Sequence, residues 1–255
     1  MHLCRDLEPV RRLLLREEPA TRSIYNIIFG RAGGKATWVR VDDRDDPKVV
    51  LCRAWWLTMY AASRAAGRRC LDELPDRWRL NFSSTPSWVC EHVGRTRRVR
   101  WSTPCFGYAL TDPARLDIHR AHRVGRLVPG DSRTVARYWP YHHGHGDSMY
   151  IKRRIRSGPT CAIRRDGRLV AWALTHGDGS LGFLHVLEPW RGRGMARSIG
   201  TALSRQVMRR GWMPFLFIEK KNRASQRLTE KMGLERVGSY SWFSSGPRRP
   251  RAGRA

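Results

Sequence analysis

The strongest constraint on the fold is the stretch EPWRGRGMARSIGTAL, residues 188–203, where glycines and arginines stand directly before an apolar helical pattern. The first four N–H groups of a helix have no partner inside it, and the helix dipole makes that end partly positive. Gly192 and Gly194 let a ligand approach the backbone closely. Three arginines of the same stretch add positive charge: Arg191, Arg193 and Arg197. The stretch therefore predicts a phosphate-binding loop in front of a helix over residues 194–210.

The elements before this loop separate it from other phosphate-binding loops. Residues 160–189 read as three strands, with turns at Asp166-Gly167 and at residues 177–180, so the loop follows an antiparallel meander. A Rossmann fold requires GxGxxG after the first strand of a parallel alternation, and a P-loop requires GxxxxGK[ST]. The sequence predicts neither of these folds but an α/β (α+β) domain with a mixed sheet.

Periodicity and turn residues predict the remaining elements. Helices are expected at residues 4–17, 86–96, 132–138, 148–156 and 222–232, and strands at 36–43, 48–57, 104–110, 213–220 and 234–243. The polar segment 111–131 is interpreted as a crossover between two halves. The aromatic residues Trp55, Trp56 and Tyr60 are expected to pack in the core of the first half.

The composition indicates a folded, strongly basic protein. Hydrophobic residues make up 41% of the 255 residues, and eleven tryptophans supply core volume. The net charge of +27 is compatible with a solvated basic surface, or with non-specific contact to nucleic acid, since no zinc finger or RNP motif is present.

Targeting signals and cysteine spacing suggest a compartment. No window reaches the roughly 18 apolar residues of a membrane span, and the charged N-terminus lacks the apolar core of a signal peptide. The six cysteines are scattered without a CxxC pair, so we expect reduced thiols, no metal site and a cytoplasmic location.

The order of elements in the second half, together with its motifs, resembles the GNAT superfamily of acyl-CoA-dependent N-acyltransferases. The acyl-CoA loop of that family, Arg/Gln-x-x-Gly-x-Gly/Ala, corresponds to residues 191–196, and Val186 stands five residues ahead, as is frequent in the family. A second motif about 30 residues later matches at Asn222, Ala224, Ser225, Leu228 and Gly233, with Leu234 in place of the usual Phe. The resemblance covers about residues 125–243.

Residues 127–174 are more specifically similar to the glycine N-acyltransferase-like branch. In that branch the N-terminal half is a degenerate GNAT-like unit. The resemblance implies a first half at residues 1–115 and an acyltransferase domain at residues 116–245. The basic tail at residues 246–255 lacks apolar residues of any size, so we expect it to be disordered.

The resemblance also implies the ligands. Acetyl-CoA or another acyl-CoA is the expected co-substrate, without a metal, and an amine is the expected acceptor: an amino acid, a small molecule or a peptide. The thioester would lie near residues 185–187, where backbone N–H groups can polarise its carbonyl. The predicted contacts to acyl-CoA are Val186, Leu187, Arg191, Gly192, Arg193, Gly194, Met195, Ala196, Asn222 and Ser225.

The residues for proton transfer depart from the family pattern. The position where many members carry a glutamate base is Ser180, and the position of the usual tyrosine acid is Thr229. These departures leave room for a catalytically weak acyl-CoA sensor, or for a basic RNA-binding module, as alternatives to an enzyme.

Other residues offer substitutes for the missing acid and base. His185 has a side chain suited to base chemistry near neutral pH, and a packed groove histidine is the alternative. Asp178, with His176, could act through a water, and Tyr240 could protonate the leaving thiolate. Glu188 is interpreted as structural.

The histidine-rich stretch YHHGHGD, residues 141–147, suggests a metal site at first sight. Its histidines lack helical spacing and a cysteine partner, so contact with the acceptor or a plain loop explains the stretch better.

Overall fold

The computed structural model describes residues 1–30, 36–139 and 147–248. The chain divides into two compact units. The first unit contains residues 1–107, 219–221 and those from 237 onward, and the second contains residues 108–218 and 222–236. The three histidines of the stretch at residues 141–147 lie outside the described residues, and only its last residue, Asp147, is described. The two glycines of residues 31–35 also lie outside the described residues.

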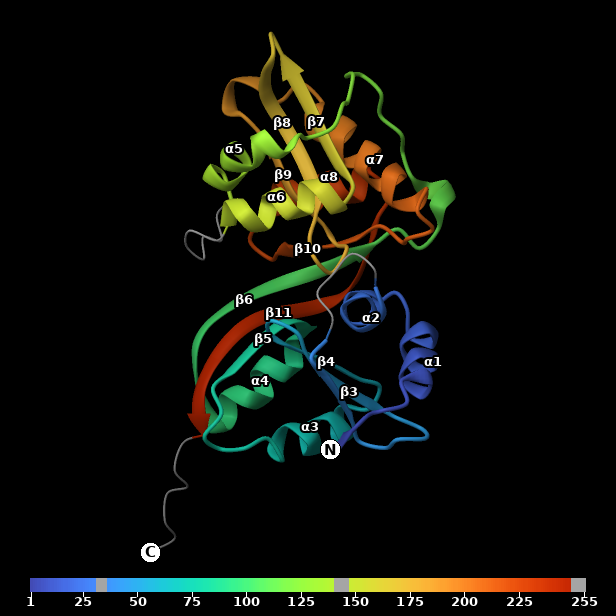
Figure 1. The fold of residues 1–255 in the computed structure, drawn as a ribbon, viewed down its shortest axis with the longest axis vertical. Coiled ribbons are helices and arrows are strands. Elements are labelled where there is room, and N and C mark those ends of the chain that lie inside the picture. Colours follow the sequence, from blue (N-terminus) through green and yellow to red (C-terminus); the bar gives the residue numbers. More distant parts are fainter. Residues whose placement is uncertain (31–35, 140–146, 249–255) are drawn as a thin grey trace, which may run out of the picture. The chain divides into compact units, whose positions relative to one another are not determined.

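The first unit is built on a sheet whose strands follow the order β1-β2-β3-β4-β5-β11-β6 (Figure 1). Neighbouring strands are antiparallel in the pairs β1–β2, β2–β3, β3–β4 and β5–β11, whereas β4 and β5 are parallel, with Leu57 opposite Phe82. The strands are β1 (His2–Leu3), β2 (Trp38–Val41), β3 (Val49–Arg53), β4 (Leu57–Ala61), β5 (Leu80–Pro86), β6 (Arg97–Ala109) and β11 (Glu235–Arg248).

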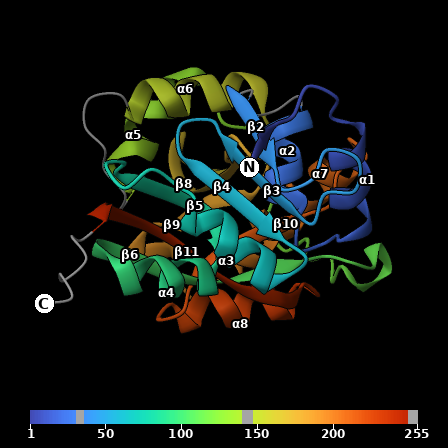
Figure 2. The same cartoon turned by 90° about the horizontal axis from the view of Figure 1, so that it is seen from below.

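Helices cover both faces of this sheet, which can be followed in Figure 2. Along β3, Val49 and Leu51 pack against α3 and α4, while Val50 and Cys52 pack against α1 and α2. Because both faces are buried, β3 is a continuous apolar run and not an alternating one. The helices are α1 (Glu8–Arg16), α2 (Arg22–Phe29), α3 (Arg64–Asp72) and α4 (Ser87–Thr96).

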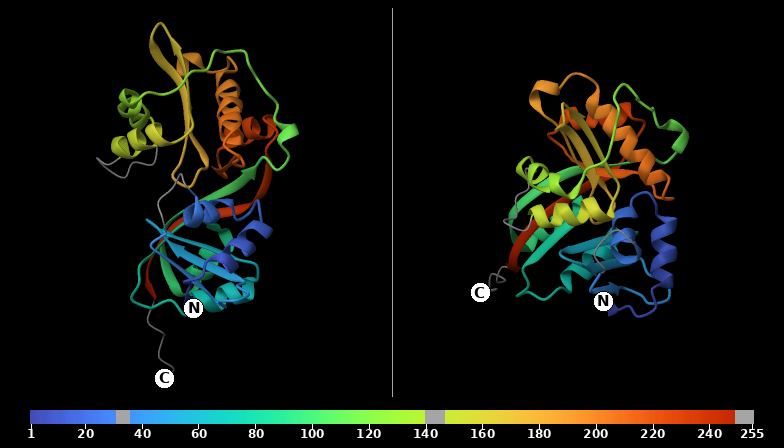
Figure 3. Two further views of the ribbon diagram at one scale, coloured as in Figure 1. Left: turned by 45° about the vertical axis from the view of Figure 1, so that its right-hand side comes forward. Right: turned by 45° about the horizontal axis from the view of Figure 1, so that its top comes forward.

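The second unit contains a three-stranded antiparallel sheet, β7 (Thr160–Arg165), β8 (Arg168–Thr175) and β9 (Leu181–Val186). Helix α7 (Met195–Met208) covers one face, and α5 (Ser132–Arg137) and α6 (Asp147–Ser157) cover the other (Figure 3). The buried face of α7 carries Ile199, Leu203 and Val207, which are spaced four residues apart and therefore lie on one side of the helix.

Three short 3₁₀ helices and two further elements complete the second unit: η1 (Pro113–Arg115), η2 (Pro129–Asp131), η3 (Glu188–Trp190), β10 (Phe215–Glu219) and α8 (Arg223–Lys231). Strand β10 does not join the three-stranded sheet. Just before β10, the carbonyl oxygen of Pro214 accepts from the Leu110 amide, which follows β6, at 2.9 Å. Strand β9 is therefore an edge strand of its sheet within the described residues.

Two sequence-based expectations are corrected by the fold. Strand β11 continues to Arg248, so residues 246–248 are not part of a disordered tail; the Arg248 amide donates to the carbonyl of Asp76 at 2.8 Å and anchors the strand end. Trp55 is 81% exposed and does not pack in the core, because it lies in the turn between β3 and β4.

The unit boundaries also differ from the expected division at residues 115 and 245. Strand β11 pairs with β5, with Tyr240 opposite Pro86, and this pairing draws the residues from 237 onward into the first unit.

Candidate functional site

The glycine loop stands at the start of α7 with two residues in the left-handed backbone conformation. Gly192 has φ +75° and Gly194, the N-cap of α7, has φ +76°. For other residues this conformation costs about 1–2 kcal/mol. A Cβ on Gly194 would lie 2.9 Å from Cε1 of His119, whereas a Cβ on Gly192 would meet no atom within 4 Å. The loop thus leaves the backbone bare ahead of the first-turn amides of α7, which have no partner within the helix.

The three arginines of the loop are held differently. Arg191 donates from Nε to the carbonyl oxygen of Val186 at 3.2 Å, and the guanidinium of Arg193 lies 5.1 Å from the ring centroid of Trp190. Arg197 forms an ion pair with Asp117. Because no ion pair is recorded for Arg191 or Arg193 within the described residues, these two exposed arginines supply most of the positive charge for an anion.

Two histidines that the sequence did not single out also contact the loop. Arg165 donates to Nδ1 of His122 at 3.0 Å, and the other ring nitrogen, Nε2, lies 2.6 Å from the carbonyl oxygen of Arg193. Since a guanidinium only donates, Nδ1 accepts, and the ring proton is on Nε2, which donates to the loop carbonyl. His119 places Nδ1 2.8 Å from the Ser198 hydroxyl. The crossover segment 111–131 therefore supports the loop, and its histidines were the only sequence signal for this role.

Strand β9 is interrupted by a bulge next to this loop. Trp172 pairs with His185 and Leu174 pairs with Gly182, so two β9 residues, Phe183 and Leu184, face the single residue Ala173. Phe183 has φ +53°, a strained value for a non-glycine residue. Bulges of this kind redirect side chains and are common beside active sites.

The backbone donors of β9 differ in their availability. The Leu187 amide donates to the carbonyl oxygen of Val170 at 2.9 Å, so this amide is used within the sheet. Successive residues of a strand direct their N–H and C=O groups to opposite sides. Because Leu187 points toward β8, both backbone groups of Val186 point to the open edge of β9, where its carbonyl accepts from Arg191. Of the predicted polarising groups at residues 185–187, the Val186 amide is the one placed for a ligand.

A cavity of about 320 Å³ adjoins the bulge, and its lining is almost entirely aromatic and aliphatic. The lining residues are Val135, Tyr138, Trp139, Trp172, Phe183, Leu184 and His185. The imidazole of His185 lies between two rings of this set, with centroids 4.9 Å from Trp172 and 4.7 Å from Tyr138. No carboxylate lines the cavity within the described residues, so His185 is its one candidate base.

The environment of His185 favours the neutral imidazole. Burial, with a smaller contribution from the positive charge of Arg191, lowers the pKa of His185. A neutral ring at physiological pH can accept a proton, which a general base must do.

Asp178 and His176 occupy the turn before β9. The carboxylate of Asp178 accepts from the amide of Ser180 at 3.1 Å and from the Ser180 hydroxyl at 2.7 Å. Burial lowers the pKa of His176 to about 4, against the opposing effect of Asp178, and its ring stacks 4.3 Å from Phe183. These contacts give both residues a structural task in the turn.

Tyr240 belongs to the first unit and not to the unit that carries the glycine loop. It is 5% exposed, its hydroxyl donates to the carbonyl oxygen of Ala20 at 3.1 Å, and burial raises its pKa to about 12. A buried phenol with a raised pKa gives up its proton poorly, so nothing in its surroundings supports a role as acid.

Asn222 of the second motif is the N-cap of α8. The side chain of Asn222 accepts from the Ser225 amide at 3.1 Å, which satisfies one of the orphan donors at the helix start. Thr229 and Ser180, at the positions where the family has its usual acid and base, are 3% and 5% exposed. Three more predicted contacts adjoin the glycine loop: Leu187, Met195 and Ala196. Of these, Met195 and Ala196 pack in the core between α7 and its sheet.

Metal and membrane signals can be stated for residues 1–30, 36–139 and 147–248. Over these ranges no group of three or more His, Cys, Asp or Glu side chains is arranged to hold a metal ion. The helices there are all too short or too polar to span a bilayer.

The chain was compared with family models, with curated proteins and with solved structures. The model of the FR47-like protein family matches residues 161–243, about a third of the chain, and no curated protein matches significantly. Among solved structures, a Drosophila protein shows 21% identity and a TM-score of 0.64 over 78% of this chain and 74% of its own.

Two similar structures carry the name of the superfamily in their descriptions. A GCN5-related N-acetyltransferase-like protein from Streptococcus suis has 17% identity and a TM-score of 0.52, covering 95% of this chain and 99% of its own. A GNAT-family acetyltransferase from Colwellia psychrerythraea has 13% identity and a TM-score of 0.54, with 97% and 99% covered. The chain thus has the GNAT fold.

Proposed function

We propose that this protein transfers an acetyl or other small acyl group from acyl-CoA to an amine. The observation that carries the proposal is the pair of left-handed glycines at the start of α7, beside the edge of β9 that pairs with no strand among the described residues. The loop amides and Arg191 and Arg193 would hold the pyrophosphate of the acyl-CoA, and the Val186 amide would polarise the thioester carbonyl.

The acceptor would enter the aromatic cavity and react in a ternary complex. The amine nitrogen attacks the thioester carbonyl carbon, the carbon–sulfur bond breaks, and the electron pair leaves with the CoA thiolate. His185 takes the proton that the amine loses, and water protonates the thiolate. No covalent enzyme intermediate is required.

Two finer statements belong to the same proposal. Assignment to the glycine N-acyltransferase-like branch rests on the sequence resemblance of residues 127–174, and it favours an amino acid or a similar small amine as acceptor. A cytoplasmic location is supported by the six free thiols, which suit a reducing compartment.

The test combines calorimetry with a turnover assay. Titration with acetyl-CoA and with CoA should show binding, and thiol release from acetyl-CoA should depend on an added amine from a panel of amino acids, small amines and peptides. If neither acetyl-CoA nor CoA gives a heat of binding, the proposal is contradicted.

A catalytically inactive acyl-CoA sensor is the second candidate, because Ser180 and Thr229 are buried at the usual positions of the base and acid. Binding of acetyl-CoA without thiol release, with every amine tested, would favour the sensor.

A further inference from the structure

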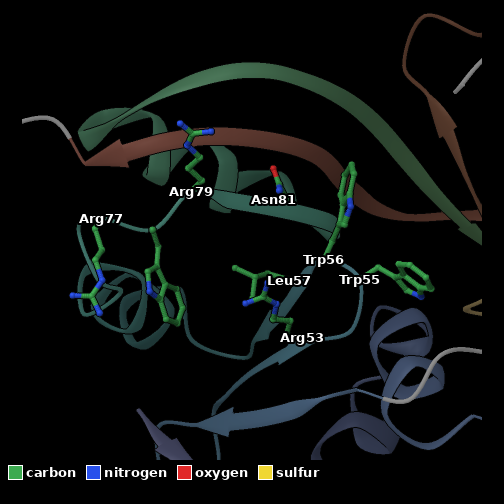
Figure 4. A pocket seen from close by; sticks show the side chains of 8 residues that line it. Arg53, Trp55, Trp56, Leu57, Arg77, Arg79 and Asn81 are labelled. Atoms are coloured by element: carbon green, nitrogen blue, oxygen red, sulfur yellow. The ribbon is translucent and has the colours of Figure 1, made fainter. Parts of the chain in front are cut away.

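A second cavity, of about 370 Å³, lies within the first unit and is lined by indole rings and guanidinium groups (Figure 4). The lining residues are Arg53, Trp55, Trp56, Leu57, Arg77, Trp78, Arg79 and Asn81. We call this cavity the tryptophan–arginine pocket. None of its lining residues belongs to the second unit, which carries the glycine loop and the aromatic cavity.

Strand pairing brings two separate segments of the chain together at this pocket. Leu57 at the start of β4 lies opposite Phe82 on β5, so the turn between β3 and β4 meets the approach to β5. Trp55 and Trp56 lie in the turn, directly after Arg53 at the end of β3. The segment before β5 carries Arg77, Trp78 and Arg79. Figure 4 shows Trp55 and Trp56 on one side of Leu57 and Arg77 on the other.

The segment that carries Arg77 and Arg79 is held by a buried arginine. Arg97, which is 2% exposed, donates to four main-chain carbonyl oxygens at 2.7–3.3 Å: those of Leu74, Pro75, Asp76 and Trp78. These bonds fix the backbone of the segment, so the two arginines project from a rigid support. A site that is organised before binding loses less entropy when a ligand arrives.

The charge of the pocket is positive and uncompensated. Arg53, Arg77 and Arg79 are exposed, and within the described residues no carboxylate lines the pocket and no ion pair is recorded for these three side chains. The ligand that matches this charge is an anion, and arginine forks match phosphate in particular.

The aromatic part of the pocket requires more than phosphate. Trp55 is 81% exposed and Trp101 is 42% exposed, and the ring of Trp101 lies 5.5 Å from that of Trp56, extending the aromatic surface beyond the pocket. Indole rings left open to solvent beside cationic groups provide stacking platforms for planar bases. An acidic peptide would use the arginines and leave the exposed indole of Trp55 facing water.

We infer that the tryptophan–arginine pocket binds single-stranded nucleic acid, with bases stacked on Trp55 and Trp56 and phosphates held by Arg77 and Arg79. Unpaired strands are required, because bases inside a duplex are stacked on one another and cannot reach the indoles. Every base has a flat face, so the pocket is expected to bind without strong sequence preference.

The test measures fluorescence anisotropy of a short labelled oligouridylate and a short labelled oligothymidylate over a series of NaCl concentrations. Trp55→Ala should weaken binding about tenfold, whereas Trp55→Phe should keep most of the affinity because it retains a stacking ring. The double variant Arg77→Gln/Arg79→Gln should also lower the slope of log affinity against log salt by about 1.4, or about 0.7 per lost phosphate contact.

The matched control removes the same charge elsewhere in the first unit. Arg12 and Arg68 are exposed, lie outside the pocket and have no recorded ion pair among the described residues, so Arg12→Gln/Arg68→Gln should leave affinity and salt slope nearly unchanged. Thermal melts and acetyl-CoA titrations of all variants should match those of the unaltered protein, which separates this inference from the proposed acyl transfer.

Several outcomes would overturn the inference. The first two are no binding of either oligonucleotide at low salt, and equal loss of affinity in the control and the pocket variants. The others are equally tight binding of a duplex, and full displacement of the oligonucleotide by polyglutamate at the same charge concentration or by uridine monophosphate at the same nucleotide concentration.

Discussion

At the residue scale, the chemistry of the aromatic cavity depends on the surroundings of one imidazole. His185 lies between Trp172 and Tyr138, and burial followed by the charge of Arg191 lowers its pKa. The free base therefore persists to lower pH than for an ordinary histidine with pKa about 6.5. The lowered pKa keeps the His185 imidazole neutral, and so able to accept a proton, across the physiological pH range. It also makes the imidazole a weaker base than an ordinary histidine.

Replacing His185 tests this role. The variant His185→Gln should lower kcat/KM for amine acylation by about 10²–10⁴-fold, because general-base assistance is lost, while acetyl-CoA affinity stays nearly the same. In the unaltered protein, kcat/KM should fall with decreasing pH only below about 6.5, and this limb should vanish in the variant. Rates measured across the pH range decide the matter, and an unchanged acid limb in the variant would assign the base elsewhere.

The glycines of the loop are a second residue-scale feature. Gly194→Ala should weaken acetyl-CoA binding by at least about tenfold, since the new Cβ meets both a left-handed backbone and the His119 ring at 2.9 Å. Gly167→Ala is the matched control, because Gly167 has the same left-handed backbone (φ +74°) and a Cβ there meets no atom within 4 Å. In a His119→Ala background the penalty of Gly194→Ala should shrink in calorimetric titrations. A Gly194→Ala variant with full affinity would remove the loop from the site.

At the element scale, the start of β6 organises the segment between α3 and β5. Arg97 begins β6 and its guanidinium serves four carbonyl oxygens of residues 74–78. These carbonyls lie outside any helix or strand ladder, and a buried carbonyl without a donor is destabilising. The Pro75 and Asp76 carbonyls also accept from the amides of Trp78 and Arg248, so the carbonyls of Leu74 and Trp78 depend most on Arg97.

The variant Arg97→Lys should therefore reduce the free energy of unfolding by about 2–4 kcal/mol, because an ammonium group cannot reach all four acceptors. Arg98→Lys, at the exposed neighbouring position, should change stability by less than about 0.5 kcal/mol. Urea unfolding followed by circular dichroism measures both. Equal stability of the two variants would show that water can satisfy these carbonyls.

Elements with a strong local pattern were predictable from the sequence. Helix α7, its buried residues four apart, and the Asp166-Gly167 hairpin between β7 and β8 were expected within a few residues of their observed positions. The bulge in β9 was not expected, because it depends on the register against β8 and leaves no mark in the apolar pattern of residues 181–186.

At the scale of the whole molecule, protonation of buried groups links stability to pH. Burial lowers the pKa of His176 to about 4 in the folded protein, with Asp178 opposing and Arg154 adding to the shift. In the unfolded chain its pKa is about 6.5. Between these values the unfolded state binds a proton that the folded state does not, so stability falls as pH decreases from about 6.5 to about 4.

For this one group the expected slope is up to about 1.4 kcal/mol per pH unit within that window. His176→Phe, which keeps a ring against Phe183, should abolish this part of the pH dependence. Urea unfolding at neutral pH and at mildly acid pH, for both proteins, gives the difference. A variant that loses as much stability on acidification as the unaltered protein would assign the effect to other groups.

The sequence alone determined the local features of this protein: the helix periods, the hairpin turns, and the glycine–arginine loop that predicted a phosphate site in a GNAT fold. These follow from neighbours in the chain, whose spacing repeats with the helix or the strand. Only the tertiary structure decided that His119 and His122 support the loop and that Leu187 uses its amide within the sheet while Val186 does not. It also decided that the exposed Trp55 lines the same pocket as arginines from a distant segment. These depend on strand register and on contacts between residues far apart in the chain, and neither has a periodic signature in the sequence.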